Sequence, residues 1–245
     1  MDIIEKNDYT FNRHPWEISR AFCILDLLRV NPAAFCYADI GAGDLYFTKL
    51  LREITSKIIY AVDKNFENLE TSVDGIVKCR TLEQVPQNSI DAVVLMDVLE
   101  HVEDEESFLS SVLRILKPGG EIIITLPAHQ FLFSNHDRFM RHFRRYNIKY
   151  IQSILHRNNL DVFKCHYFYT TLFFIRGLEK LLEKAGLLNN KKQGIGKWPL
   201  RCDSIITRLI TKLLNLDFKI NAYLYKFKII FTGLSICVIC KKRSY

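Results

Sequence analysis

The chain has 245 residues, of which 49% are hydrophobic and 25% charged, and its formal net charge is +7. That length suits one large α/β domain with at most one substantial elaboration, and the apolar content excludes wholesale disorder. Residues 176–245 carry 15 Lys or Arg against four Asp or Glu, so residues 1–175 are net acidic. The basic part predicts an anionic partner, such as an acidic membrane surface, a phosphorylated substrate or a nucleic acid.

The first residues are polar and charged, without the apolar stretch of a secretory signal. The longest charge-free apolar runs, 165–175 and 229–240, are shorter than the roughly 20 residues of a spanning helix. We therefore expect a cytoplasmic protein. Peripheral contact with the inner face of the membrane is compatible with that expectation.

The seven cysteines are scattered and odd in number. Cys237 and Cys240 have the C-x-x-C spacing of redox and zinc sites, but they lie in an alternating apolar run that predicts a strand. Residues i and i+3 of a strand face opposite sides, and no second pair completes a zinc set. The sequence favours buried, reduced cysteines and no metal site, with metal or redox use as the alternative.

Helices and strands alternate along the first 127 residues. Helices are predicted over 13–30, 44–53 and 104–116, and strands over 36–40, 57–63, 76–79, 90–96 and 121–126. This alternation predicts a parallel sheet with right-handed crossovers. After Pro127 comes a loop over 129–146 that is dense in His, Arg and aromatic residues. A helix over 148–158, a strand over 160–169, helices over 172–184 and 203–227 and a strand over 234–239 complete the prediction.

A glycine turn follows the first strand and leads directly into a helix, with Asp39 before it and Gly41 and Gly43 in it. Glycines tolerate positive φ and let a ligand approach the backbone, and the helix start offers free N–H groups. These features predict a nucleotide-type cofactor site. A dinucleotide turn would read G-x-G-x-x-G, but Tyr46 occupies the third position, which argues for a mononucleoside cofactor.

Four motifs in order carry a resemblance to a known family. They are Asp39-x-Gly41-x-Gly43, Asp63 after the second strand, Asp97-Val98-Leu99-Glu100-His101 after the fourth, and the turn Leu116-Lys117-Pro118-Gly119-Gly120. The chain resembles class I S-adenosylmethionine-dependent methyltransferases, most closely over 35–127, and is similar to bacterial quinone-biosynthesis-type (type 11, 12 and 23) enzymes. The resemblance implies a Rossmann-like α/β fold with a seven-stranded, mostly parallel sheet, helices on both faces and a helical elaboration before the last strand. It also implies one domain over 1–245, with an N-terminal helical lid over 1–34 and a basic helical insertion over 168–231.

The same resemblance implies how S-adenosylmethionine would be held. Asp39 would lie near its ammonium and sulfonium groups, and Asp63 would grip the ribose diol with two acceptor oxygens. Where many relatives carry an acid for the adenine amino group this chain has Thr81, so a hydroxyl and backbone groups, or Glu83, would take that contact. The implied set is Asp39, Gly41, Ala42, Gly43, Asp63, Lys64, Thr81, Leu82 and Asp97; helix caps in an unrelated turn are the alternative for the acids.

Methyl transfer is an in-line displacement that depends on alignment, and it needs a base only for a hydroxyl or a protonated amine. His101 and His136 are the catalytic candidates, with His129 and His142 as further candidate bases, because all four follow strands at the edge where open α/β folds bind ligands. The motif His136-Asp137 followed by His142-x-Arg144-Arg145-Tyr146 is similar to a signature of the bacterial subgroup. It implies a substrate pocket, for which the candidates are Trp16, His142, Arg144, Arg145 and Tyr146. A loop tied down by internal ion pairs is one alternative, and a metal site, which no fixed helical spacing supports, is another.

The insertion is basic, aromatic and amphipathic, which predicts contact with an anionic membrane or a lipid-like substrate, or else a solvated helical cap. Large aliphatic residues among the basic ones, and the lack of a recognition module, argue against nucleic acid. We predict a methyltransferase that acts on a small-molecule or lipid-linked acceptor by O-methylation. The alternatives are an RNA or protein methyltransferase that uses the basic C-terminal region, and a non-catalytic cofactor-binding protein of the same fold. The oligomeric state stays open.

Overall fold

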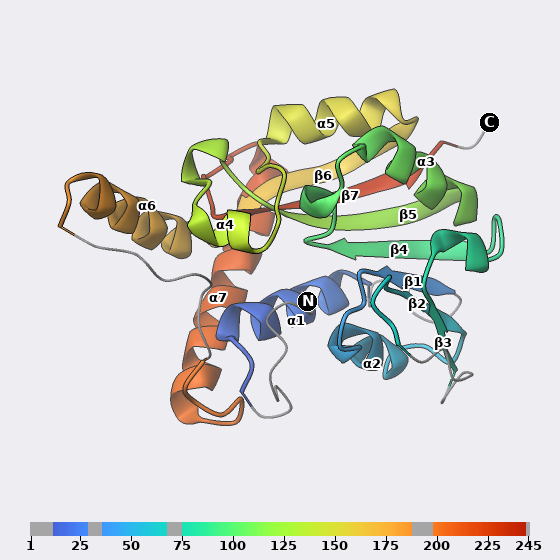
Figure 1. The fold of residues 1–245 in the computed structure, drawn as a ribbon, viewed down its shortest axis with the longest axis horizontal. Coiled ribbons are helices and arrows are strands. Elements are labelled where there is room, and N and C mark those ends of the chain that lie inside the picture. The colour runs from blue at the N-terminus through green and yellow to red at the C-terminus, as the bar shows by residue number, and fades with distance from the viewer. Residues whose placement is uncertain (1–11, 29–35, 68–74, 188–197, 244–245) are drawn as a thin grey trace.

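A computed structural model describes residues 12–28, 36–67, 75–187 and 198–243 (Figure 1). Its strands are β1 (Tyr37–Ile40), β2 (Ile59–Val62), β3 (Ile76–Cys79), β4 (Ile90–Met96), β5 (Leu116–Pro127), β6 (Leu160–Phe168) and β7 (Ser235–Lys242). Its α-helices are α1 (Pro15–Leu28), α2 (Tyr46–Arg52), α3 (Glu105–Ile115), α4 (Asn135–Phe139), α5 (Ile148–Arg157), α6 (Thr170–Lys184) and α7 (Ile205–Leu224). Short 3-10 turns are η2 (Leu82–Gln84), η3 (Leu99–His101), η4 (Gln130–Leu132) and η5 (Tyr225–Phe227).

The described strands form one seven-stranded sheet in the order β3-β2-β1-β4-β5-β7-β6. The pairs on the β3 side of β5 are parallel, whereas β7 runs antiparallel to both β5 and β6. The strand order reverses between β1 and β4, so the connections that follow these two strands leave in opposite directions. A crevice with room for a ligand therefore forms at the carboxyl ends of β1 and β4. This sheet confirms the predicted seven-stranded, mostly parallel architecture.

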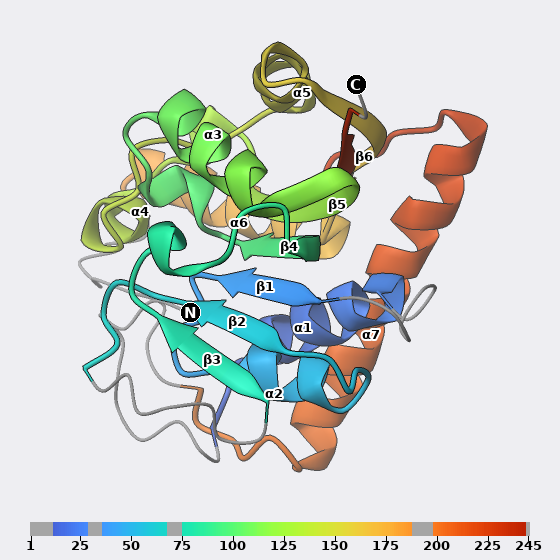
Figure 2. The same ribbon diagram turned by 90° about the vertical axis from the view of Figure 1, so that its right-hand side faces the viewer.

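Helices cover both faces of the sheet (Figures 1 and 2). Side chains of α3 and α5, such as Leu109 and Leu155, share one buried cluster with the sheet. Side chains of α1, α2 and α7, such as Leu25, Leu51 and Phe218, share the cluster on the other face. A strand covered on both faces has few polar positions, which explains the nearly continuous apolar character of β4.

Five of the seven cysteines are buried as predicted, whereas Cys36 and Cys202 are half-buried. Cys237 packs in the cluster under α1 and α7, while Cys240 packs in the cluster under α3 and α5, so the two thiols of the C-x-x-C sequence face opposite sides of β7. All seven cysteines are free thiols.

Two boundaries differ from the prediction for local reasons. Strand β5 begins at Leu116, because Leu116 pairs with Ile90 before residues 117–120 bulge and pairing resumes at Ala92 and Glu121. The predicted loop 129–146 contains α4, which begins with a capping box: the backbone N–H of Ser134 donates to Asp137 Oδ2 at 2.8 Å. A Ser three residues before an Asp was a readable signal for that helix start.

The two regions predicted as elaborations differ in how they pack. Of the predicted lid 1–34, residues 1–11 and 29–34 lie outside the described residues, and α1 packs as a layer on the sheet. From the insertion, α7 packs against α1 and β6, whereas α6 has no buried residue and projects from the body of the molecule (Figure 1). In the described part of the chain, no helix combines the length and the apolar character needed to cross a membrane.

Candidate active site

A cavity of about 1120 Å³ lies where β1, β2 and β4 end. The end of β1 contributes Gly41, the end of β2 contributes Asp63, and the end of β4 contributes Asp97. Small-molecule pockets usually measure roughly 300–1,000 Å³, so this cavity has room for a nucleoside cofactor and an acceptor side by side. Helices α1 and α6 line the cavity as well.

The glycine turn is held by backbone bonds and by one carboxylate. The Gly41 N–H donates to the Val62 carbonyl at 2.8 Å, and the Gly43 N–H donates to Asp63 Oδ2 at 2.9 Å. Gly41 has φ 76°, and a Cβ there would lie 2.7 Å from Val98 Cγ2. Only glycine fits this position, and the absent side chain leaves the backbone open to the cavity.

Asp63 ties the turn to β2 and still has acceptor capacity. Its Oδ1 accepts the Asn65 N–H at 2.9 Å, so each carboxylate oxygen makes a short bond to a backbone N–H. Oδ1 also accepts the side-chain amide of Asn65 at 3.1 Å, so both of its lone pairs are occupied, whereas Oδ2 can accept one further hydrogen bond. A nucleoside hydroxyl can therefore bond Oδ2 directly, and the second hydroxyl of a diol would replace the Asn65 amide on Oδ1.

Asp39 lies behind the turn. It is 1% exposed and accepts the Thr48 hydroxyl at 2.5 Å. Burial raises the pKa of the Asp39 carboxyl to about 6, although the bond from Thr48 works in the opposite direction. With Ala42 it borders a smaller hollow of about 30 Å³ that shares Gly41 with the main cavity.

The predicted cofactor residues are therefore brought together at one end of the cavity. Those that line the cavity itself are Gly41, Asp63, Lys64, Thr81, Leu82 and Asp97. Asp39 and Ala42 border the smaller hollow, and Gly43 acts through its N–H bond to Asp63.

Thr81 and Glu83, the two alternatives for the adenine contact, lie together at the start of η2. Thr81 directly precedes η2, and its side chain beside Glu83 lowers the pKa of the Glu83 carboxyl. Both side chains line the cavity. A hydroxyl and a carboxylate are thus available together at the position where the sequence suggested one or the other.

Arg20 on α1 was not identified from the sequence, yet it is central to the site. Its guanidinium forms an ion pair with Asp97 and lies 4.8 Å from the ring centroid of Trp16. Asp97 has φ 53° and also accepts the Thr125 hydroxyl at 3.0 Å. Burial lowers the pKa of Arg20. A charged residue among the apolar positions of the first helix was the available signal, and Trp16 and Arg20 together place α1 over the Asp97 end of the cavity.

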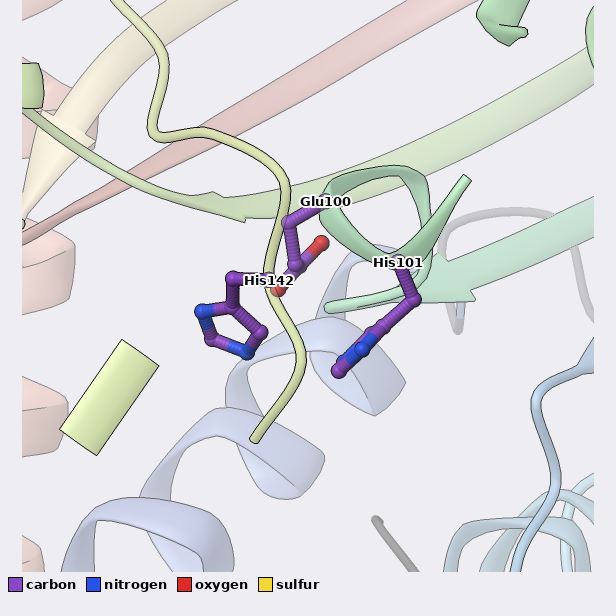
Figure 3. Close-up of side chains that lie close together, drawn as sticks. All are labelled: Glu100, His101 and His142. Carbon is purple, nitrogen blue, oxygen red and sulfur yellow. The ribbon is translucent and has the colours of Figure 1, made fainter. Parts of the chain in front are cut away.

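The far wall of the cavity brings together two of the four candidate histidines. His101 comes from η3 and His142 from the segment after α4, with ring centroids 4.6 Å apart at an interplanar angle of 81°. Fully buried Glu100 lies beside them (Figure 3). Asp137 bonds His142 Nδ1 at 3.0 Å and receives Arg145 Nε at 2.8 Å.

The electrostatics of this wall fix which groups are charged. Burial opposes ionisation of Asp137, but the bonds from His142 and Arg145 hold the pKa of its carboxyl well below the usual range. His136 lines the cavity as predicted, and burial lowers its pKa to about 4, so its ring is neutral near pH 7. Its Nδ1 has no hydrogen-bond partner among the described residues.

The predicted substrate-binding set divides into two groups. Trp16, His142 and Arg145 line the cavity, although the Arg145 guanidinium is already bonded to Asp137. Arg144 and Tyr146, also predicted to contact substrate, do not line it. Arg144 pairs with Glu105 at 2.6 Å and the Tyr146 hydroxyl donates to the same carboxylate at 2.5 Å. These two residues tie the loop to α3, which matches the alternative interpretation.

A family model described as a methyltransferase domain matches residues 18–165, more than half of the chain. The chain belongs to the methyltransferase-domain family. This membership and the sheet order confirm the predicted class I S-adenosylmethionine-dependent methyltransferase.

Relatives and solved structures agree with that assignment. The chain is 34% identical over 101 residues to the mitochondrial ubiquinone biosynthesis O-methyltransferase of Homo sapiens, a match that covers 36% of this chain and 27% of that protein. The chain therefore spans about a quarter of that relative. Among structures, an S-adenosylmethionine dependent methyltransferase from Mesorhizobium loti superimposes with a TM-score of 0.58 at 14% identity, covering 93% of this chain and 100% of the other. The [4+2]-cyclase SpnF gives the same TM-score at 12% identity, covering 93% and 81%. At such identities the likeness concerns the fold, and the reaction has to be argued from the site.

Proposed function

We propose that this methyltransferase transfers a methyl group from S-adenosylmethionine to an oxygen of a small, apolar or lipid-linked acceptor. One observation carries the proposal: a single cavity joins the glycine turn and Asp63 at one end to the wall of Glu100, His101 and His142 at the other. S-adenosylmethionine supplies an electrophilic methyl group on a sulfonium centre. The protein contributes alignment of donor and acceptor, which by itself can remove several kcal/mol from a barrier.

The residues at the donor end fit a nucleoside with an amino-acid tail. Asp63 and Thr81 offer oxygens for hydroxyl and amino groups, and Gly41 leaves the backbone accessible. Asp39 and Arg20 lie at the other side of the turn, where they would meet the ammonium and carboxylate groups of the methionine part. The predicted ribose and ammonium contacts stay part of this proposal.

The lining of the acceptor end favours an apolar acceptor. Met140 and Phe143 line the cavity from the segment that carries His142, and Leu172 and Ile175 line it from α6. Apolar lining with a few polar groups is typical of small-molecule sites. His136 and His101 are the polar groups that would orient the acceptor oxygen, and the neutral His136 ring suits a hydrogen bond better than strong base catalysis.

The experiment is transfer of labelled methyl groups from S-adenosylmethionine to a lipid extract, to bulk RNA and to a protein mixture. We expect label in material that partitions into organic solvent, and loss of that label with Asp63→Ala. Asp161→Ala is the matched control. Asp161 is exposed on the edge strand β6, where it pairs with Arg243, and the variant protein should transfer methyl groups normally. Label found only in RNA or protein would refute the proposed acceptor class, and no transfer with any of them would favour a non-catalytic binding protein.

The outer face of α7 supports a further part of the proposal, contact with an anionic membrane. Apolar side chains at least 48% exposed recur there with alternating three- and four-residue spacing, at Ile206, Leu209, Leu213, Leu216, Ile220, Tyr223 and Phe227. Exposed Arg208, Lys212 and Lys219 of α7 and Lys226 of η5 lie beside this stripe. Lys219 pairs with the exposed Asp26 of α1 at 3.7 Å, and no acidic residue of 204–231 is exposed. An apolar stripe edged by basic residues suits a helix lying in the surface of an anionic bilayer, and the like charges disfavour self-association of the same face.

Sedimentation with vesicles tests this contact. The protein should bind phosphatidylglycerol vesicles more than phosphatidylcholine vesicles, and the double variant Lys212→Glu/Lys226→Glu should reduce the binding at least tenfold, since each basic residue near such a surface contributes about 1 kcal/mol. Lys149→Glu, on the exposed side of α5, is the control. Equal sedimentation with both vesicle types would remove membrane contact from the proposal.

A further inference from the structure

Glu100, His101 and His142 form a cluster that was not predicted from the sequence. Each offers one ligand atom, a carboxylate oxygen or an imidazole nitrogen, and these atoms all lie within 4.8 Å of one another (Figure 3). The sequence had suggested at most a trio of His136, Asp137 and His142 and favoured no metal. We propose that Glu100, His101 and His142 bind one divalent transition-metal ion on the acceptor wall of the cavity.

Backbone bonds hold the two halves of the cluster together. Glu100 and His101 are adjacent on η3, directly after β4. The N–H of Phe143 donates to the Glu100 carbonyl at 2.7 Å, which fixes the segment carrying His142 against η3. The third ligand is therefore positioned by the fold and not by a mobile side chain alone.

His142 also has the outer partner that metal-binding histidines usually have. Its Nδ1 bonds Asp137 Oδ1 at 3.0 Å, so Nε2 is the nitrogen that remains for the cluster. Asp137 is itself held by Arg145 Nε at 2.8 Å and by the Ser134 hydroxyl at 2.9 Å. A carboxylate on the second nitrogen of a ligating histidine fixes its tautomer and ring orientation, and its loss typically costs 10–100-fold in metal affinity.

The donor set selects the class of metal. Two imidazoles and one carboxylate suit Zn²⁺ or Fe²⁺ and leave coordination positions open, whereas Mg²⁺ and Ca²⁺ prefer oxygen ligands only. Zinc bonds of about 2.0–2.1 Å place the ligand atoms roughly 3.3 Å apart, so the ligand atoms would approach one another by at most about 1.5 Å on binding.

The open positions of such an ion would face the acceptor. Glu100, His101 and His142 all line the cavity, on the wall where the acceptor lies in the proposed function. This step rests on the proposed function: a metal here restricts the class of acceptor to molecules whose hydroxyl or carboxylate oxygen can complete the coordination of the ion. A hydroxyl bound to a divalent cation ionises more readily, so its proton can pass to water, and the oxygen can then take the methyl group as the carbon–sulfur bond of the sulfonium breaks, without a side-chain base.

Cobalt is the probe, because its visible spectrum distinguishes nitrogen and oxygen ligands from thiolates in a chain with seven cysteines. The full chain, freed of metal with a chelator, is dialysed against Co²⁺ and the bound metal is counted. We expect one Co²⁺ per chain, d–d absorption without a thiolate charge-transfer band, and at least tenfold weaker binding in His142→Ala. His156→Ala, which removes an exposed histidine of α5, is the control and should bind as the parent does.

Three results would each overturn the proposal: no stoichiometric Co²⁺, Co²⁺ binding that His142→Ala and His101→Ala leave unchanged, or a bound Co²⁺ spectrum with a thiolate band. Circular dichroism checks that each variant is folded, and Glu100→Gln provides a third, isosteric variant. Calorimetric binding of S-adenosylhomocysteine to the same proteins separates the two claims. If that ligand binds and cobalt does not, only the metal proposal fails; if cobalt binds and that ligand does not, the proposed function fails.

Discussion

The buried acid at the end of β1 predicts opposite effects on stability and on binding. Burial raises the pKa of Asp39 from 3.8 to about 6. The folded state therefore binds this proton more tightly than the unfolded state, so the carboxylate destabilises the fold above pH 6 and this cost disappears as the pH falls toward 4. At about 1.4 kcal/mol per pKa unit the cost above pH 6 is about 3 kcal/mol.

Asp39→Asn should remove this cost, since an amide oxygen can still accept the Thr48 hydroxyl. We expect the free energy of unfolding to rise by about 1–3 kcal/mol at pH 8 and to change little at pH 4. Binding of S-adenosylhomocysteine should weaken about tenfold, because the substitution removes the anion that we propose to face the ammonium group of the ligand. A gain in stability with a loss of ligand affinity is common when a charge that a site retains for function is removed.

Urea denaturation at pH 8 and pH 4, with titration calorimetry at pH 8, measures both effects. Asp161→Asn, at an exposed position on β6, should alter neither quantity and serves as the control. A less stable Asp39→Asn protein at pH 8, or a stability difference that is the same at both pH values, would refute the reasoning.

Three further predictions concern single positions. Burial lowers the pKa of His166 to about 4, so the unfolded state binds more protons than the folded state between pH 6.5 and 4, and the free energy of unfolding should fall as the pH drops through that range. His166→Phe should flatten this pH dependence in urea denaturation, and an unchanged dependence of stability on pH would contradict the prediction. Gly41→Ala should lower both stability and cofactor affinity, since its Cβ would lie 2.7 Å from Val98 Cγ2 at φ 76°; thermal unfolding and calorimetry check this, and a protein like the parent would show that the turn tolerates a side chain. Arg145→Ala should destabilise the fold by about 3–5 kcal/mol, because buried Asp137 loses its cation; a change below 1 kcal/mol in urea denaturation would mean that the pair is not structural.

The donor end of the site could be predicted from the sequence because its residues follow strands directly. Gly41, Asp63 and Asp97 are placed by the ends of β1, β2 and β4, and parallel strands bring their carboxyl ends to one edge. Local pattern and sheet topology are sufficient for such residues. The opposite faces of Cys237 and Cys240 were predictable for the same reason, from the period of a strand.

The acceptor wall could be predicted only in part, because long-range contacts decide it. The sequence offered a loop tied down by internal ion pairs but did not show which residues pair; in the structure buried Asp137 bonds His142 and Arg145. Nothing local shows that the segment after α4 docks on η3 through the Glu100 carbonyl. The burial of Arg20 in α1 likewise depends on where that helix packs.

The central claim is that the cavity at the glycine turn binds S-adenosylmethionine through Asp63. Titration calorimetry with S-adenosylhomocysteine on the parent chain, Asp63→Ala and Asp161→Ala tests it most directly. We expect one site in the parent and unchanged affinity in Asp161→Ala. In Asp63→Ala the binding free energy should weaken by about 1–3 kcal/mol, because charge-assisted hydrogen bonds to the diol are lost. No binding by the parent, or equal affinity in all three proteins, would contradict it.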